Sequence, residues 1–300
     1  MIVLLSLAAL MPGLVMATEY RLYFLGGQSN MDGYGWNRDL PKEAQGTVDG
    51  VRIFAGVSVA DGESGGGAGA WTALQPGLGT WFGFSDGEYK LSDRFGPELS
   101  FGQRLRELDP DRPVALIKFS RGGTALQDGA SGYGNWAPDF DGINQYDNAL
   151  AAIRNALAVT DIDSDGSPDT FRPAGIIWMQ GEADAYHSRE AADAYQANLK
   201  RLMDLLRAAL RVDDLPVVIG MISDSGREPD GRVMDYSDTV KQAQFDFVAG
   251  DDCAALVRVT ESLEYPEDDA WHYNSDGYLK MGSAFADAVS RLHESCGSPR

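Results

Sequence analysis

The residues of this chain that could perform nucleophilic chemistry include one serine near the N-terminus. Ser29 follows Gly26 and Gly27, which end a short apolar run, 22–25, with the character of a buried strand. In open α/β sheets ligands bind at the carboxyl ends of the strands, so this serine is expected at a binding edge. A serine hydroxyl is a weak nucleophile at neutral pH and needs a base within hydrogen-bond reach.

His272 is the best candidate for that base among the three histidines of the sequence. His187 precedes a helix-like run, and His293 lies in the charged C-terminal tail. Asp269 precedes His272 by three residues, so one loop could supply both the base and the carboxylate that orients it. The pattern predicts a serine, histidine and aspartate triad for acyl transfer, with Asp268 as an alternative orienting carboxylate.

Four short segments extend this pattern. They read Gly-Gly-Gln-Ser-Asn-Met at 26–31, Gly-Gly-Thr at 122–124, Trp-Met-Gln-Gly-Glu at 178–182 and Asp-x-x-His at 269–272. In residue types and order they resemble the SGNH hydrolase superfamily, and within it the sialate O-acetylesterase and carbohydrate esterase family six (acetylxylan esterase-like) group. The resemblance implies a serine esterase with Ser29, His272 and Asp269 as its catalytic residues.

The resemblance also implies where the oxyanion of a tetrahedral intermediate is held. Its donors would be the backbone amides of Ser29 and Gly123 and the side-chain amide of Gln180, with Gly122 as the alternative glycine. Because side chains alternate along a strand, Gln180 and Glu182 would face the same way if the strand stays extended. Glu182 is then expected to anchor either that amide or the serine loop.

Other side chains could contact a substrate. Arg121 adjoins the two glycines and is a candidate substrate-binding residue, although the sequence does not indicate for which group. Several aromatic residues occupy irregular segments and would either stack on sugar rings or pack the loops down. They are Trp36, Trp71, Trp81, Phe82, Phe84 and Trp136.

A second constellation lies between a predicted helix and a predicted strand. Oxygen-bearing side chains alternate at Asp161, Asp163, Asp165, Ser167 and Asp169, with a glycine at 166. This resembles the first half of an EF-hand calcium loop, except that an arginine stands at the twelfth position in place of the bidentate glutamate. We expect a structural Ca²⁺ here, with a solvated acidic turn as the alternative, and no cofactor for catalysis.

The N-terminal segment differs from the rest of the chain. Residues 2–17 are almost wholly apolar and end in a small-residue pattern typical of a signal-peptidase site, so residues 1–17 are predicted to be a signal peptide. The protein is then expected to be secreted or periplasmic. In such a compartment Cys253 and Cys296 could form a disulfide.

Composition limits the partners. The 25 basic and 45 acidic residues give a net charge of −20, which disfavours nucleic acid and anionic membrane surfaces. With 44% hydrophobic residues and no linker or repeat, residues 18–300 are expected to form one esterase domain without a membrane anchor after signal cleavage. The sequence does not indicate the oligomeric state.

Strand-like and helix-like segments alternate along this domain. Strands are expected at 20–25, 114–119, 175–179, 217–222 and 254–259, with helices at 96–108, 146–159, 188–210, 236–248 and 275–292. The alternation predicts an α/β fold with a doubly wound five-stranded parallel sheet. The resemblance implies the three-layer α/β/α sandwich of SGNH hydrolases, which is flavodoxin-like.

The predicted function is a carbohydrate esterase that removes O-acetyl groups from sugars through an acyl-enzyme. The resemblance implies either a polysaccharide such as xylan or O-acetyl sialic acid as substrate, and the residues do not choose between them. A noncatalytic carbohydrate-binding protein on the same scaffold is one alternative. A lipid or thioester hydrolase of the same superfamily is another.

Overall fold

A seven-stranded sheet forms the centre of the computed structural model, which describes residues 17–186 and 188–296. The strand order is β11-β10-β9-β1-β8-β3-β4. Its members are β1 (Glu19–Gly27), β3 (Val51–Ala55), β4 (Trp71–Ala73), β8 (Val114–Ser120), β9 (Thr170–Met179), β10 (Val217–Gly220) and β11 (Ala254–Val257). All neighbours pair in parallel except β3 and β4, which are antiparallel.

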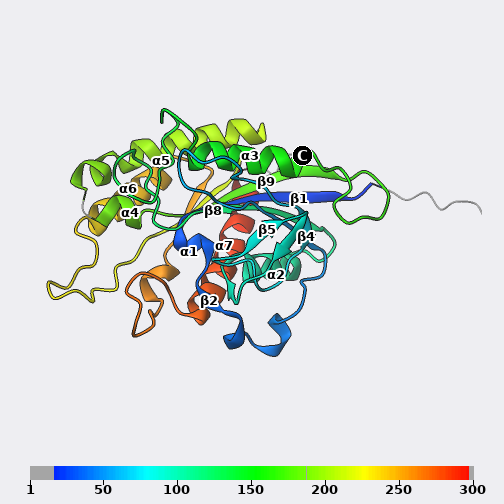
Figure 1. Ribbon diagram of the computed structural model, residues 1–300, viewed down its shortest axis with the longest axis horizontal. Helices are drawn as coiled ribbons and strands as arrows, with labels where there is room; N and C mark the ends of the chain where they lie inside the picture. The colour runs from blue at the N-terminus through cyan, green and yellow to red at the C-terminus, as the bar shows by residue number, and fades with distance from the viewer. Residues whose placement is uncertain (1–16, 187, 297–300) are drawn as a thin grey trace, which may run out of the picture.

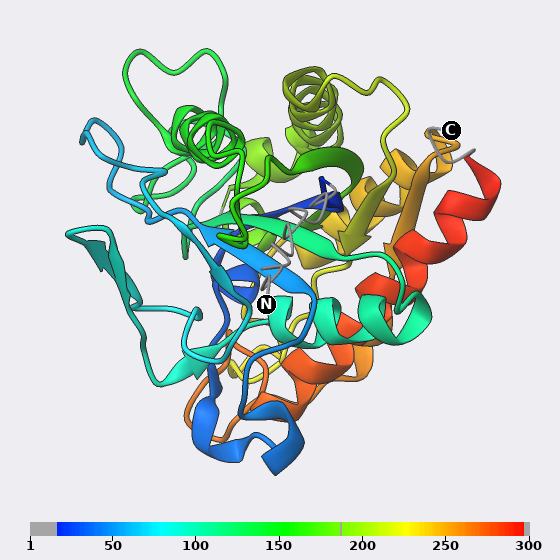
Figure 2. The same ribbon diagram turned by 90° about the vertical axis from the view of Figure 1, so that its right-hand side faces the viewer.

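Helices cover both faces of this sheet (Figure 1). One layer holds α3 (Gln145–Leu157), α4 (Glu182–Tyr186), α5 (Arg189–Leu210) and α6 (Ser237–Ala249). The other holds α2 (Glu98–Leu108) and α7 (Ser275–Ser295), which pack against each other, as Figure 2 shows from the side. Short elements complete the fold: α1 (Ser29–Asp32), β2 (Gly35–Trp36), β5 (Gly83–Ser85), β6 (Glu88–Lys90), β7 (Arg94–Phe95) and the 3₁₀ turns Asn37–Asp39, Lys42–Ala44 and Val259–Ser262.

The central strands are apolar on both faces because helices cover both. Tyr23 and Phe24 of β1 point to opposite faces and are fully buried, and all seven residues of β8 are buried. The register aligns Gly27 at the end of β1 with Ser120 on one side and Met179 on the other. Three segments singled out in the sequence therefore leave the sheet at one edge.

The predicted α/β class is confirmed, and each of the five predicted strands is present. The sheet is wider and more mixed than predicted, because β3 joins beside β8 and β4 adds an antiparallel edge. Both additions come from the long glycine-rich region, where β4 is only three residues long and half-buried. Such a strand leaves almost no periodic signal in the sequence.

The helices also follow the prediction. Ser275 was a reasonable cap for the last of them by residue type, but the structure gives that role to its neighbour. The side chain of Asn274 caps α7 by accepting the Gly277 amide at 2.8 Å. Ser275 is the first residue of that helix. Its hydroxyl instead accepts the Trp36 amide at 2.9 Å and donates to Asp39 at 2.7 Å. It ties α7 to the segment that follows the serine turn.

The two cysteines lie together but are not bonded. Cys253 precedes β11, Cys296 follows α7, and both are thiols in this structure. Burial and the neighbouring thiol raise the pKa of Cys253 to about 12. The fold thus places the pair as the predicted disulfide requires, while the bond itself stays a prediction.

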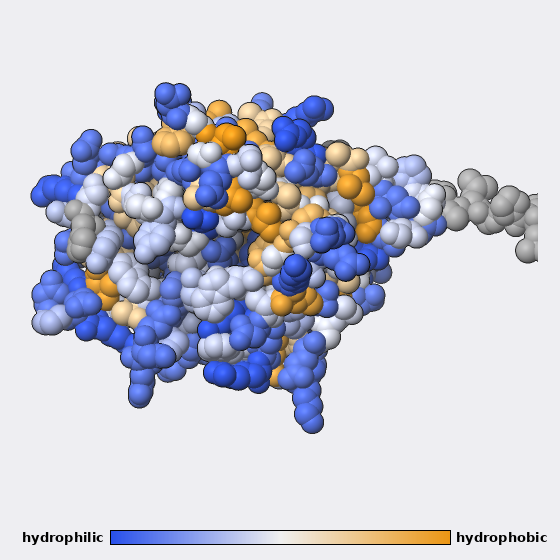
Figure 3. Space-filling model, viewed as in Figure 1, coloured by the Kyte–Doolittle hydropathy of each residue, from blue (hydrophilic) through white to orange (hydrophobic). Residues whose placement is uncertain are grey.

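The predicted signal peptide falls almost entirely outside the described residues, which begin at residue 17. None of the helices in the described part of the chain combines the length and apolar character needed to cross a bilayer. The face of the molecule seen in Figure 3 is mostly hydrophilic, with smaller hydrophobic patches between the polar side chains.

Candidate active site

A tight turn presents Ser29 at the end of β1. Gly27 has φ of 147°, and a Cβ at this position would lie 2.0 Å from the carbonyl oxygen of Met179, so only glycine fits. The chain then enters α1, where the Gln28 carbonyl accepts the amides of Met31 and Asp32. Ser29 is the first residue of this turn and is 7% exposed.

One loop supplies His272 and its carboxylate. His272 Nδ1 and Asp269 Oδ2 are 2.7 Å apart, and Asp269 Oδ1 accepts the amides of Trp271 and His272 at 2.8 and 3.0 Å. Burial alone would raise the pKa of Asp269, but the hydrogen bonds from His272 and from the Trp271 amide bring it below its usual value. Asp269 is therefore an ionised partner that fixes the ring. Asp268 is exposed and has no bond to the ring in the described structure.

Stacking also holds the imidazole. The rings of His272 and Tyr34 lie 3.6 Å apart between centroids and are parallel within 1°. Tyr34 follows the serine turn by two residues, so this stack brings the histidine loop against the serine segment. Trp81 packs edge-on against Tyr34 at 5.8 Å.

Ser29 and His272 line the same cavity of about 850 Å³. Within the described residues their side chains form no direct hydrogen bond. Catalytic hydrogen bonds of this kind are often long in an unliganded site and tighten when substrate binds. The remaining lining residues are Gln28, Asp32, Tyr34, Val57, Ser58, Thr80, Trp81, Phe82, Ser120, Arg121, Gly122, Gly123, Ala130, Ser131, Gly132, Tyr133, Ala183, Tyr186 and Trp271.

A buried amide ties the serine turn to the histidine loop. Asn30 Nδ2 donates to Glu182 Oε1 at 2.7 Å and to the Trp271 carbonyl at 3.1 Å, and Asn30 Oδ1 accepts the Tyr278 hydroxyl at 2.9 Å. Burial raises the pKa of Glu182, and the hydrogen bond from Asn30 opposes that rise. Glu182 therefore anchors the serine loop. It reaches this position as the first residue of α4, after a bend at Gly181, because the strand does not stay extended to 182.

The two glycines after β8 differ in what their amides can do. The Gly122 amide hydrogen-bonds to the Asp32 carboxylate. Within the described chain no acceptor is found for the amides of Ser29 and Gly123. Gly123 has φ of 74°, and a Cβ there would lie 2.8 Å from the Tyr133 ring. Ser29 and Gly123 both line the cavity, and their amides stay the predicted oxyanion donors.

Gln180 does not occupy the position that the oxyanion prediction requires. Its side chain is fully buried and does not line the cavity. Nε2 donates to the Thr124 carbonyl at 3.0 Å and to Asp184 Oδ2 at 2.6 Å, so both of its hydrogens are already engaged. Gln180 braces the segment that carries the glycines and offers no donor to a substrate.

A different amide lines the cavity. Gln28 Oε1 accepts the amides of Gly181 and Ala183 at 3.4 and 3.3 Å, which leaves Nε2 without a protein acceptor in the described structure. Sequence reasoning missed this residue although it directly precedes Ser29. The only signal in the sequence was the place of Gln28 in the same short motif as Ser29. The direction of its side chain depends on the bend after β9, because its oxygen bonds amides that follow that bend.

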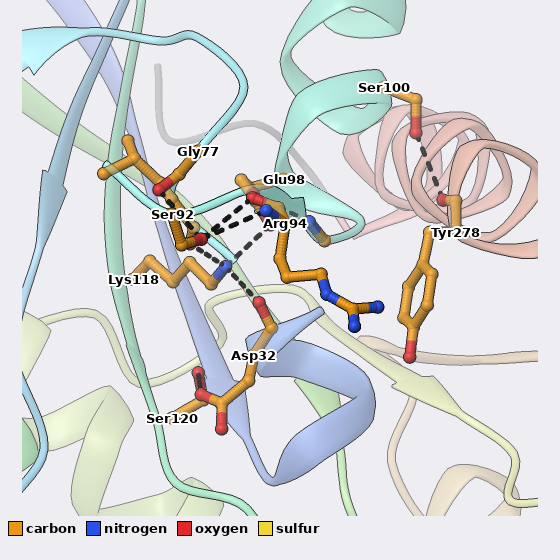
Figure 4. A network of polar contacts seen from close by, with 11 residues as sticks. Asp32, Gly77, Ser92, Arg94, Glu98, Ser100, Lys118, Ser120 and Tyr278 are labelled. Carbon is orange, nitrogen blue, oxygen red and sulfur yellow. Dashed lines mark hydrogen bonds and ion pairs between the residues drawn. The ribbon is translucent and has the colours of Figure 1, made fainter. Parts of the chain in front are cut away.

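Beneath the serine turn lies a buried ion pair that the sequence did not indicate. Lys118 Nζ donates to Glu98 Oε2 at 2.7 Å and to the carbonyls of Asp32 and Leu78 at 2.8 Å each, as Figure 4 shows. Lys118 is 2% exposed and Glu98 is fully buried. Each of the three hydrogens on Lys118 Nζ has an acceptor, and these hydrogen bonds offset the cost of burying the charge. It fixes the end of α1 against β8 and α2.

The other predicted substrate contacts fall into two groups. Arg121 lines the cavity, and its Nε donates to the Tyr133 carbonyl at 2.9 Å. Trp81 and Phe82 also line it, and Trp81 is 69% exposed. The other aromatics do not line this cavity: Trp136 is buried, Trp71 donates to the Ala156 carbonyl, Phe84 packs on Tyr89 and Trp36 lies under the Arg94 guanidinium.

The acidic loop between α3 and β9 gathers three of its five predicted ligands. Carboxylate oxygens of Asp161, Asp163 and Asp169 lie within 4.8 Å of one another. Asp165 is exposed, its carboxylate accepts the Ser167 amide, and its own oxygens do not join the group. Asp169 is 7% exposed and its Oδ1 is buried without a hydrogen-bond partner in the described structure, which suits a metal ligand.

Comparison with known proteins identifies the family. The model of the carbohydrate esterase, sialic acid-specific acetylesterase family matches residues 19–291. A structure of a protein from Arabidopsis thaliana is similar with a TM-score of 0.64 and 19% identity over 92% of this chain and 99% of that one. A carbohydrate acetylesterase from Xanthomonas citri is similar with a TM-score of 0.62 and 17% identity over 92% of this chain and 57% of that one. NanS is similar with a TM-score of 0.59 and 15% identity over 93% of this chain and 99% of that one. No curated protein sequence matches the chain.

The sheet has an α/β fold and brings a serine and a carboxylate-bound histidine to one cavity at its carboxyl edge, an arrangement that suits a hydrolase. The structural neighbours share this fold. The chain belongs to the carbohydrate esterase family of sialic acid-specific acetylesterases, and it is a carboxylic ester hydrolase.

Proposed function

We propose that this protein removes O-acetyl groups from sugars, with Ser29 as the nucleophile, His272 as the general base and Asp269 as the orienting carboxylate. The observation that carries the proposal is the 2.7 Å contact between Asp269 and Nδ1 of His272, which lines the same cavity as Ser29. That contact leaves the other ring nitrogen, Nε2, to take a proton from the serine hydroxyl.

The reaction proceeds in two halves. Ser29 Oγ attacks the acetyl carbonyl carbon while its proton passes to His272 Nε2, and the carbonyl oxygen becomes an oxyanion held by the amides of Ser29 and Gly123. The intermediate collapses to an acetyl-serine, and the sugar oxygen leaves with the proton from His272. Water then attacks the acetyl-serine and gives its proton to His272, which passes it to Ser29 Oγ as the second intermediate collapses, and acetate and the free serine are released.

The cavity rim supports a sugar as the alcohol part of the ester. Trp81 and Tyr133 are 69% and 68% exposed at this rim, and neither side chain is needed to fill the core. Aromatic faces of this kind pack on the apolar faces of pyranose rings. The polar lining close to Ser29, which includes Gln28, Ser120 and Arg121, suits a hydroxyl-rich group better than a long acyl chain.

The test is acetate release from acetylated xylan, O-acetyl sialic acid and aryl esters of increasing acyl length. We expect turnover of acetylated sugars and of short acyl chains, with Ser29→Ala lowering kcat at least about 10,000-fold. A preference for long acyl chains would favour the lipid hydrolase. Sugar binding without turnover would favour the noncatalytic carbohydrate-binding protein.

We also propose that Asp161, Asp163 and Asp169 bind a structural Ca²⁺. The unpartnered buried oxygen of Asp169 supports this, because such an atom normally has a partner. Bound calcium would neutralise part of the local negative charge and hold the loop that leads into β9. Catalysis as proposed uses only protein groups and water.

A further inference from the structure

Trp81 holds a backbone conformation that its residue type rarely adopts. It lies in the turn before β5, and its φ of 67° is in the left-handed region, where a bulky side chain is strained. Turns that need this conformation normally use glycine or asparagine. A residue kept in it needs a compensating gain, and strained positions of this kind concentrate at active sites and at segments that clamp a ligand.

Burial does not supply that gain. Trp81 is 69% exposed, and its side chain does not pack against the hydrophobic core. The next residue, Phe82, is partly buried and does pack against the core. The turn could therefore be held down without a tryptophan at 81, and the indole is free to serve a ligand.

The indole is nevertheless held in place by its neighbours. The guanidinium carbon of Arg94 lies over the Trp81 ring, 5.2 Å from its centroid. Arg94 is buried, and its Nη1 donates to the Tyr34 carbonyl at 2.6 Å. The Tyr34 ring contacts the indole at 5.8 Å between centroids. Because the guanidinium covers one face and the side chain is still mostly exposed, the opposite face is open where Trp81 lines the cavity.

Trp81 lies outward from the catalytic groups. Tyr34 links the two sites, because its ring stacks on the His272 imidazole at 3.6 Å and contacts the indole at 5.8 Å. A sugar whose acetyl group is at Ser29 occupies the space beside His272. The cavity of about 850 Å³ is at the large end of the range for small-molecule sites, so it has room for more than one sugar ring.

We propose that Trp81 forms a second sugar subsite, in which its open face binds the sugar ring that is glycosidically linked to the acetylated ring. The inference rests on the proposed acetylesterase function and deepens it by naming the substrate class, a linked saccharide in preference to a free monosaccharide. A pyranose ring presents an apolar face of C–H groups that packs on an indole, and this contact needs no charge. The subsite therefore suits neutral and acidic acetylated sugars alike.

The experiment compares monosaccharides with disaccharides that carry the same acetyl group. One pair is acetylated methyl xyloside and acetylated methyl xylobioside, and the other is the methyl glycoside of O-acetyl sialic acid and O-acetyl sialyllactose. For a pair that the wild-type enzyme turns over, we expect kcat/KM to favour the disaccharide by about three- to ten-fold, the effect of one aromatic contact. Trp81→Ala should abolish this preference, and Trp81→Phe, which keeps a ring, should retain part of it.

The ratio within a pair separates binding at Trp81 from a disturbed catalytic site. A shift of Tyr34 in Trp81→Ala would slow both members of a pair alike and leave their ratio unchanged. Phe245→Ala is the matched control, because it removes an exposed aromatic ring from α6 that does not line the cavity. It should keep the wild-type ratio.

Two results would overturn the subsite: a wild-type enzyme that does not prefer the disaccharide, or a Trp81→Ala variant that keeps the wild-type ratio. Turnover of neither pair, or retention of acetate release by Ser29→Ala, would instead overturn the proposed function. The two failures are therefore distinguishable.

Discussion

Asp269 bonds its own loop through one carboxylate oxygen and the imidazole through the other. The backbone amides of Trp271 and His272 hold Oδ1, and this fixes Oδ2 on His272 Nδ1. A carboxylate held in this way sets the tautomer of the ring and stabilises the imidazolium that forms during attack. Its neighbour Asp268 has the same side chain but is exposed, and the described structure shows no hydrogen bond from it to the ring.

Replacing these two neighbours separately tests the orientation. Asp269→Asn should lower kcat about 10,000-fold, because an amide presents a donor to Nδ1 and favours the wrong tautomer. Asp268→Asn should change kcat less than about two-fold, since an exposed side chain away from the ring contributes little. Steady-state kinetics with an aryl acetate measures both. Equal losses in the two variants would show that the loop, and not the carboxylate, is what matters.

At the residue scale, residue type and spacing predicted that Ser29 and His272 share a site and that Asp269 bonds the imidazole, and the structure places them so. Their catalytic roles stay a proposal. The directions in which the side chains of Gln180 and Gln28 point could not be predicted. Both are glutamines beside a glycine at a strand end, and only the bend at Gly181 decides which one lines the cavity. Asp32 had no pattern of its own, because its exposure to the cavity depends on how β8 aligns with β1.

The junction between β9 and α4 shows how one element positions another. Asp184, fully buried in α4, accepts the amides of Leu126 and Gln127 and the Gln180 side chain. It thereby holds the segment after β8, which includes Gly123, the glycine proposed as an oxyanion donor. Burial raises the pKa of Asp184 to about 6, although these hydrogen bonds oppose the rise.

This raised pKa predicts a specific pH dependence of stability. In the unfolded chain Asp184 has an ordinary pKa near 4, so between that value and about 6 the folded state binds more protons than the unfolded state. Stability from this group therefore rises as pH falls. From pH 7 to 5 the wild-type protein should gain about 1 kcal/mol relative to Asp184→Asn. Urea unfolding of both proteins at both pH values measures this, and a constant difference between them would contradict it.

Elements with a strong apolar period were predictable, and the edge of the sheet was not. The strands β1, β8 and β9 are buried on both faces and so leave continuous apolar runs. The edge strand β4 is half-buried and three residues long, and its pairing with β3 depends on contacts distant in sequence. Glu182 was expected at a strand end, whereas the chain bends before it and begins a helix.

At the scale of the whole molecule, the acidic loop connects parts of the fold that are distant in sequence. The Tyr20 hydroxyl of β1 donates to Asp163 at 2.9 Å, and Asp169 leads directly into β9. A cation bound there would therefore join the amino ends of two central strands. Its effect should appear in global stability and not only in the loop.

Calcium should accordingly raise the melting temperature. Binding at about 100 times the dissociation constant stabilises by about 2.7 kcal/mol, which corresponds to a shift of roughly 5 °C for a domain of this size. Thermal unfolding with excess EGTA and with excess CaCl₂ measures the shift. Asp169→Asn should abolish it, whereas Asp165→Asn, outside the three-carboxylate group, should keep it. An unchanged melting temperature in the wild-type protein would exclude the site.

The central claim is that Ser29 forms a covalent acyl-enzyme with the help of His272. The most direct measurement treats the protein with a phosphonate ester, which mimics the tetrahedral intermediate, and locates the adduct by peptide mass spectrometry. We predict one adduct, on Ser29, that forms far more slowly in His272→Gln. An adduct on another residue, or undiminished acetate release by Ser29→Ala, would contradict the account.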